Sequence, residues 1–275
     1  ACSSALVAMY IARRETLGCR NTFDAVHDML CGGVHIISPR NSYLCYLAGM
    51  LSAEGRCKVL DMHADGYVRG ECCELQILSR CKSHTQRCVL MACTVAQDGR
   101  TSSLTAPNGI AQVILISTTA HAATVEVDHI GAIQLHGTGT ILGDPIEVSS
   151  TFKALRPSMK VSHAPLMAQA VKSRSGHAEP ASGCASFAHL VHSLSESAAI
   201  AIVHLRHLNA HVSDVLSLNS KIQLALFTRE NMQSLSRTQA ISSFAFQGTN
   251  AHAIVSVAHD EFQIRRQLAC KSIMY

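Results

Sequence analysis

The sequence contains no tryptophan, and aromatic residues make up only 4% of its 275 residues. Leucine, isoleucine, valine, alanine and methionine must therefore fill the interior. Charged residues are scarce at 15%, and the net charge of +4 comes without runs of lysine or arginine. Because nucleic-acid binding needs clustered basic residues, we expect no nucleic-acid partner. No apolar run reaches the roughly 18 residues that a membrane helix requires, so we expect no membrane partner either.

Disulfide patterns are also missing, although the chain has 12 cysteines. No two of them form a Cys-x-x-Cys pair, and nothing at the start is typical of a signal peptide. This distribution favours reduced thiols in the cytoplasm. The first residue is alanine, so we expect a chain that was processed, excised or truncated.

A metal site is not supported by the histidine pattern. His204, His207 and His211 could share one helical face, but no carboxylate or cysteine completes a ligand set there. A polar face or loop is the better interpretation, and we expect no bound metal.

What the sequence does contain is an alternation of helical and strand patterns, which predicts an α/β fold with a largely parallel sheet. Residues 201–240 are the least readable part. The expected helices are Ser3–Leu17, Pro107 to about Ala123, one that starts with Asp144 as N-cap and Pro145 at its first position, and Pro180 to about Ile200. The expected strands are Met29–Ile36 broken at Gly32-Gly33, Leu75–Leu78 after a turn at Gly66–Gly70, Val89–Val95, Ile130–Leu135, Leu166–Val171, Ala240–Phe244 and Ala251–Val257.

Reactive side chains lie at the ends of these elements. Cys2 directly precedes a predicted helix, whose electropositive N-terminus would lower the thiol pKa and favour a thiolate nucleophile. His136 and His177 each follow a short apolar strand and lie beside glycine, so they could donate to an enolate oxygen or carry a proton. Taken alone, each of the three is more often a structural residue than a catalytic one. Lys172 could set the charge state of the His177 loop or form a salt bridge.

Several blocks in collinear order resemble one known family. They are Ala1-Cys2-Ser3-Ser4-Ala5-Leu6-Val7-Ala8, Ala64-Asp65-Gly66-Tyr67-Val68-Arg69-Gly70-Glu71, Leu104-Thr105-Ala106-Pro107-Asn108-Gly109, His136-Gly137-Thr138-Gly139-Thr140 with Gly143-Asp144-Pro145-Ile146-Glu147, Lys172-Ser173 with Gly176-His177, and Gly248-Thr249-Asn250-Ala251-His252. Together they resemble the β-ketoacyl synthase (ketosynthase) domain of modular polyketide synthases, in the thiolase-like superfamily.

The resemblance implies a layered αβαβα fold and a Cys-His-His site. Cys2 would accept an acyl chain from acyl carrier protein, and His136 and His177 would promote decarboxylation of a malonyl-type extender and condensation. Lys172 would support the His177 side electrostatically. Thr138 and Thr140 would hold the phosphopantetheine arm. The N–H groups of Cys2 and Phe246 would form the oxyanion hole, with Phe246 also gating the pocket.

The same resemblance implies no directly bound cofactor, because the substrates travel on the phosphopantetheine of acyl carrier protein. It implies acyltransferase and other synthase domains as partners, and a homodimer of the complete domain. We expect the ketosynthase domain over residues 1–258 and a C-terminal tail over 259–275. Since the match begins at the nucleophile block, we expect the N-terminal half of the domain to be largely missing and the isolated chain to carry out no condensation.

Departures from the family pattern keep alternatives open. Arg174-Ser175 replaces the usual Asn-Ile and would put a bulky cation beside His177. Ala245 replaces a glycine, and Cys72 and Glu74 replace small residues. A degenerate, non-catalytic ketosynthase-like module is therefore one alternative, and a fatty-acid-type synthase is another. A thiolase fits less well, because its second cysteine would have to be Cys270, beyond the last matched block.

Overall fold

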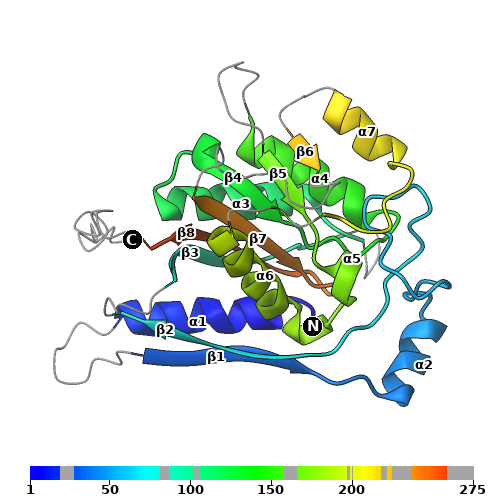
Figure 1. Ribbon diagram of the computed structural model, residues 1–275, viewed down its shortest axis with the longest axis horizontal. Coiled ribbons are helices and arrows are strands. Elements are labelled where there is room, and N and C mark those ends of the chain that lie inside the picture. The colour runs from blue at the N-terminus through cyan, green and yellow to red at the C-terminus, as the bar shows by residue number, and fades with distance from the viewer. Residues whose placement is uncertain are drawn as a thin grey trace.

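The computed structural model describes residues 1–18, 28–80, 87–101, 106–157, 166–196, 199, 201–217, 222–224 and 237–258 (Figure 1). Within these ranges the strands form one six-stranded and one two-stranded sheet. The predicted tail 259–275 and Cys270 lie outside the described residues.

The six-stranded sheet has the order β3-β8-β7-β4-β5-β6. Its strands are β3 (Cys88–Gln97), β4 (Ile130–Gln134), β5 (Leu166–Gln169), β6 (Ile222–Leu224), β7 (Thr238–Phe244) and β8 (Thr249–Val257). The pairs β7–β4, β4–β5 and β5–β6 are parallel, whereas β8 is antiparallel to both β7 and β3. The expectation of a largely parallel sheet is therefore wrong at this end. A tight turn joins β7 directly to β8, and so short a connection can only form an antiparallel hairpin.

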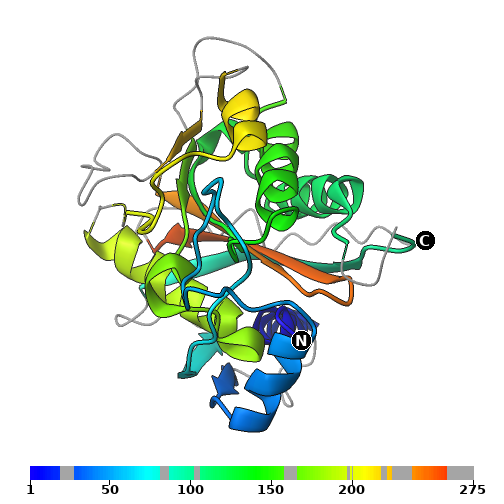
Figure 2. The ribbon, with the colours of Figure 1, turned by 90° about the vertical axis from the view of Figure 1, so that its right-hand side faces the viewer.

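Helices cover both faces of this sheet (Figure 1). On one face lie α3 (Gly109–Ala123) and α4 (Gly143–Leu155), and on the other lie α1 (Ser4–Gly18) and α6 (Ser182–Glu196). The small antiparallel sheet of β1 (Asp28–His35) and β2 (Cys72–Ser79) packs against α1 and α6 from below. Figure 2 shows the blue α1 nearly end-on beneath the large sheet. The described residues thus form four layers, α-β-α-β, and confirm the layered α/β class.

The outer face of the small sheet is apolar and open. Alternate residues of its two strands point outward, and Leu30, Val34, Leu75 and Ile77 are each more than half exposed. In the expected αβαβα order a further helical layer would cover this face. The described residues do not form that layer.

The helix α3 shows how local sequence sets an element. The side chain of Asn108 accepts hydrogen bonds from the N–H groups of Ile110 and Ala111, which caps the helix start. Thr124 ends the helix in a left-handed conformation. The next strand, β4, is buried at all five positions, as its apolar run predicts. The predicted helix from Pro107-Asn108-Gly109 and the predicted strand from Ile130 are both confirmed.

One predicted break does not exist. Strand β1 runs without interruption through Gly32 and Gly33. A Cβ atom at Gly33 would lie 2.7 Å from the Cα of Ala181, in the 3₁₀ turn just before α6. These glycines therefore permit close packing of the strand on its neighbours and do not end it.

Several short elements were not predicted. They are α2 (Pro39–Leu47), α7 (Ala210–Ser217), strand β6, the one-turn helix α5 (Lys172–Ser175) and two 3₁₀ turns, Val127–His129 and Glu179–Ala181. The start of α2 was readable, because Ser38 caps it and Pro39 occupies its first position. His204 and His207 lie before α7 and His211 lies within it, so the three histidines do not share one helix.

None of the helices in the described ranges combines the length and apolar character needed to cross a membrane.

Candidate active site

A cavity of about 340 Å³ opens where α1 begins and the strands β4 and β7 end. It brings together residues from separate parts of the sequence. Of the predicted site residues, it is lined by Cys2, His136, Thr138, Thr140, His177 and Phe246. Lys172 lies behind this lining, fully enclosed in the interior.

Cys2 is held in place through hydrogen bonds to its main-chain carbonyl group. Its carbonyl oxygen accepts hydrogen bonds from the hydroxyl of Ser182, at the start of α6, and from the hydroxyl of Ser243, in β7, at 3.0 and 2.8 Å. Two elements from the second half of the chain therefore hold the cysteine at the cavity wall. We did not predict these serines, because the partners lie 180 and 241 residues from Cys2.

The cysteine and the two histidines form one cluster. The Nε2 atom of His177 lies 3.1 Å from the Sγ atom of Cys2. The rings of His136 and His177 meet edge to face with their centroids 5.4 Å apart. Within the described structure neither Nδ1 atom has a hydrogen-bond partner. The proton of each ring is therefore not confined to one nitrogen by a neighbour.

Burial favours the neutral form of each group in this cluster. Burial raises the pKa of the Cys2 thiol, and the nearby charge of Lys172 and the N–H of Phe246 lower it by less. Burial also lowers the pKa of His136 and of His177 well below the ordinary value, and Lys172 lowers both further. The expectation of a lowered thiol pKa is therefore wrong, because burial raises the pKa of the Cys2 thiol.

Lys172 acts at a distance and not through a salt bridge. Its ammonium group has no hydrogen-bond partner among the described residues. Burial lowers its pKa, while the carboxylates of Glu147 and Asp144 oppose that shift. Because its charge disfavours a second cation nearby, Lys172 helps to keep both histidines neutral.

Two buried carboxyl groups shape the His136 loop. Glu147 accepts hydrogen bonds from the main-chain N–H groups of His136 and Gly137, at 2.6 and 2.8 Å. Asp144 accepts from those of Leu60 and Gly139. Burial raises the pKa of Asp144 to about 6 and that of Glu147 to about 7. The prediction that Asp144 is the N-cap of α4 is wrong, because the helix begins at Gly143 and Leu142 is the capping position.

The cavity wall next to His136 is suited to an extended polar chain. The hydroxyl oxygens of Thr138 and Thr140 lie 3.3 Å apart on the same loop. Between them Gly139 has φ +77°, and a Cβ atom there would lie 2.8 Å from the main-chain N of Lys58. Phe246 lines the cavity at the β7–β8 turn with 39% of its surface exposed.

The departures noted in the sequence leave the cluster undisturbed. Arg174 is exposed and donates to the carbonyl of Ala201, so it does not lie beside the ring of His177. Ala245 has no positive φ, so this position does not require glycine. Cys72 and Glu74 are part of β2, away from the cavity lining.

No group of three or more histidine, cysteine, aspartate or glutamate side chains in the described ranges is arranged to hold a metal ion. Nine cysteines are described, and all are free thiols. The arrangement offers a nucleophile, a proton acceptor in contact with it, a second neutral imidazole and a channel with hydroxyl groups. These groups suit acyl transfer through a covalent thioester.

Comparison with known proteins agrees with this chemistry. Residues 1–84 match the profile of the β-ketoacyl synthase N-terminal domain, and residues 87–206 match that of the C-terminal domain. One of the proteins that make up the phenolphthiocerol/phthiocerol polyketide synthase of Mycobacterium tuberculosis is 34% identical over 268 residues. That match covers 94% of this chain and 12% of the relative.

Solved ketosynthases have the same fold. The ketosynthase from module 6 of the bacillaene synthase of Bacillus subtilis superposes with a TM-score of 0.83 at 25% identity, over 94% of this chain and 46% of that one. A ketosynthase domain of the Streptomyces albus oxazolomycin synthase gives 0.83 at 29% identity, over 94% and 45%. The chain thus spans slightly less than half of these structures.

The thiolase-like fold and the polyketide synthase relatives agree with the cluster of Cys2, His136 and His177. The chain belongs to the β-ketoacyl synthase family, as a ketosynthase domain of the modular polyketide synthase type.

Proposed function

We propose that this site performs the decarboxylative Claisen condensation of polyketide synthesis. An acyl group held on Cys2 would be extended by a malonyl-type unit on acyl carrier protein. The observation that carries the proposal is the 3.1 Å contact between Cys2 Sγ and His177 Nε2, beside His136 in one cavity.

The first half-reaction loads the cysteine. The Cys2 proton passes to His177 Nε2, and the thiolate attacks the carbonyl carbon of an acyl thioester. The N–H groups of Cys2 and Phe246 would stabilise the oxyanion, and the hydrogen bond of Phe246 toward the Cys2 sulfur supports this role. The C–S bond to the phosphopantetheine breaks, and its thiolate takes the proton from His177.

The second half-reaction extends the chain. The malonyl thioester loses CO₂, and the two neutral imidazoles donate N–H groups to the enolate oxygen. The enolate carbon attacks the acyl carbonyl on Cys2, so a C–C bond forms and the C–S bond to Cys2 breaks. The Cys2 sulfur leaves as a thiolate and takes up a proton from solvent, which restores the thiol. Because no partner holds either Nδ1 atom, each ring can present Nε2 as an acceptor in one half-reaction and as a donor in the other.

Thr138 and Thr140 would hydrogen-bond the phosphopantetheine arm, and Lys172 would keep the histidines neutral. Acyl carrier protein and further synthase domains would be the partners, because the relatives are much longer polyketide synthase proteins. The homodimer, the cytoplasmic location and the domain bounds 1–258 stay predictions. A non-catalytic module and a fatty-acid-type synthase are less well supported, since Cys2 and both histidines line one cavity and the relatives are polyketide synthases.

Acyl transfer to Cys2 can be measured on the chain by intact mass after incubation with an acyl N-acetylcysteamine thioester. We expect one acyl group per chain, lost in Cys2→Ala and kept in Cys73→Ala, because Cys73 is an exposed thiol away from the cavity. An adduct that persists in Cys2→Ala would refute Cys2 as the nucleophile. That the 275 residues alone carry out no condensation stays a prediction. Release of a β-ketoacyl product by the purified chain would contradict it.

A further inference from the structure

His177 lacks the usual means of fixing a catalytic imidazole. Its Nε2 faces Cys2, and its Nδ1 has no hydrogen-bond partner in the described structure. No carboxylate or carbonyl group therefore orients the ring through its second nitrogen. The orientation must come from the main chain of His177 and from the rings that touch it.

The main chain of His177 is clamped on both sides. Its N–H donates to the carbonyl of Val68 at 2.7 Å, and its carbonyl accepts from the N–H of Gly70 at 2.9 Å. The residue between these two partners is Arg69, which pairs with His177 as a parallel bridge. The ring of Tyr67 meets the His177 ring edge to face, with the centroids 5.0 Å apart.

The side chain of Arg69 binds a second residue close to His177 in the sequence, Glu179. Its Nε and Nη2 atoms donate to the two carboxylate oxygens of Glu179 at 2.7 and 3.2 Å. Glu179 lies two residues after His177 and has φ +39°, a left-handed conformation that is costly for a residue with a side chain. The pair with Arg69 thus holds strained backbone next to the histidine.

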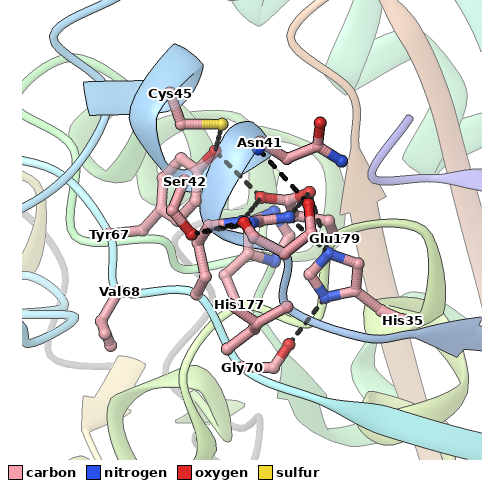
Figure 3. A network of polar contacts seen from close by, with 12 residues as sticks. His35, Asn41, Ser42, Cys45, Tyr67, Val68, Gly70, His177 and Glu179 are labelled. Atoms are coloured by element: carbon pink, nitrogen blue, oxygen red, sulfur yellow. Dashed lines mark hydrogen bonds and ion pairs between the residues drawn. The ribbon is translucent and has the colours of Figure 1, made fainter. Parts of the chain in front are cut away.

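His35 completes the network (Figure 3). Its Nδ1 donates to the carbonyl of Gly70 at 2.7 Å, which leaves Nε2 to accept from Arg69 Nη2 at 2.8 Å. The hydroxyl of Tyr67 also reaches Glu179 Oε1, at 3.4 Å. Arg69, Glu179 and His35 come from three separate segments and line no part of the cavity.

We propose that Glu179, Arg69 and His35 are positioning residues, which hold the His177 ring against Cys2 from outside the reaction cavity. This inference rests on the proposed function, because it assigns the network to the Cys2–His177 pair. None of the three touches the reacting atoms.

A purely electrostatic role for Glu179 predicts the opposite effect. The charge of Glu179 is the third-largest influence on the pKa of the Cys2 thiol, after burial and the charge of Lys172. It raises this pKa. Removing the charge alone would therefore favour the thiolate and speed its reactions. Removing a positioning group would slow them, since a reacting group displaced by about 1 Å can lose on the order of 100-fold in rate.

The experiment measures alkylation of individual cysteines by iodoacetamide, using peptide mass spectrometry. Cys2 reports on the site, the exposed Cys73 on the reagent and the buried Cys93 on unfolding. The variants are Glu179→Gln, Arg69→Lys, their combination and His177→Asn. Glu54→Gln is the matched control, because Glu54 pairs with Lys58 in a separate ion pair.

We expect Glu179→Gln, Arg69→Lys and His177→Asn each to slow Cys2 labelling by about tenfold or more. Cys73 should react at its wild-type rate and Cys93 should stay protected. The double variant should lose little more than either single variant, because both substitutions break the same pair. Glu54→Gln should behave as wild type. Cys2 labelling in Glu179→Gln that is unchanged or faster, in a chain whose Cys93 is protected, overturns the proposal.

A second measurement does not depend on thioester chemistry. It also keeps the proposal testable if one of the two variants unfolds. The NMR resonances of the His177 ring, assigned by their loss in His177→Asn, should shift in whichever of Arg69→Lys and Glu179→Gln remains folded. Those of the buried His252 should not, because Ser242 holds that ring elsewhere. An unshifted His177 ring refutes positioning. A shifted ring in a chain that forms no Cys2 adduct refutes only the proposed function.

Discussion

The contact between α1 and α6 beneath the nucleophile gives a prediction for Gly183→Ala. Gly183 lies in the first turn of α6, and a Cβ atom there would be 2.9 Å from both the main-chain N and the Cγ of Leu6 in α1. Ordinary contacts are about 3.5–4.0 Å, so the two helices would have to separate by about 0.5–1 Å.

The net effect is a difference between two terms. Overpacking of this kind costs about 1–3 kcal/mol, while replacing a helical glycine by alanine gains up to about 1 kcal/mol. We therefore expect Gly183→Ala to lower the free energy of unfolding by about 1–2 kcal/mol. Because the hydroxyl of the adjacent Ser182 holds the carbonyl of Cys2, acylation of Cys2 should also slow.

The assay is urea unfolding followed by circular dichroism, together with the rate of Cys2 acylation by intact mass. Gly18→Ala is the matched control: it is the last residue of α1, and a Cβ atom there would meet nothing within 4 Å. That variant should be neutral or more stable by up to about 1 kcal/mol. If Gly183→Ala is as stable and as reactive as Gly18→Ala, the close packing of α1 on α6 does not fix Cys2.

Three further predictions concern the loops around the cavity. Burial raises the pKa of Glu147 from 4.5 to about 7, so folding takes up a proton between these values and the stability that Glu147 contributes is lost as pH rises through about 7. In urea unfolding, the free energy of unfolding of Glu147→Gln relative to that of wild type should therefore increase from pH 4.5 to pH 7. A difference between the two proteins that does not change with pH would contradict a buried carboxyl group with a raised pKa. Ala245→Gly should destabilise by about 0.4–1 kcal/mol without faster acylation, because the position has no positive φ; a gain in stability or rate would show that the family glycine is needed. Thr138→Val and Thr140→Val should each raise the pantetheine thioester concentration needed for half-maximal Cys2 acylation about two- to tenfold, the value of one hydrogen bond, with the maximal acylation rate nearly unchanged. A loss confined to the maximal acylation rate would exclude a role in holding the arm.

The sequence predicts elements well where the signals are local. The Asn108 cap and the apolar run after Ile130 identify α3 and β4, because capping and burial patterns depend on neighbouring residues. Gly32-Gly33 was misread as a break, since only the approach of Ala181 shows why the strand needs glycine. The electrostatics of Cys2 were misread for a similar reason. Burial depends on the whole fold, and it raises the thiol pKa that the helix terminus alone was expected to lower.

The site residues were found in the sequence through order and resemblance, but their supports were not. Ser182 and Ser243 hold Cys2 across 180 and 241 residues of sequence, and no periodicity links them. Asp144 and Glu147 belong to the same sequence block as His136, but they lie in the first turns of α4. Their role as buried acceptors for main-chain N–H groups depends on how the His136 loop folds against that helix. Arg69 and Glu179 form their pair across 110 residues.

The most direct test of the site compares Cys2 acylation in wild type, His177→Asn and His136→Asn by time-resolved intact mass. His177 contacts the sulfur at 3.1 Å, whereas the ring of His136 meets the rings of His177 and Phe244, with centroids 5.4 and 5.8 Å apart. We predict a Cys2 adduct that forms at least about tenfold more slowly in His177→Asn and at nearly the wild-type rate in His136→Asn. Equal rates in all three chains, or a greater loss in His136→Asn, would contradict His177 as the group that takes the proton of Cys2.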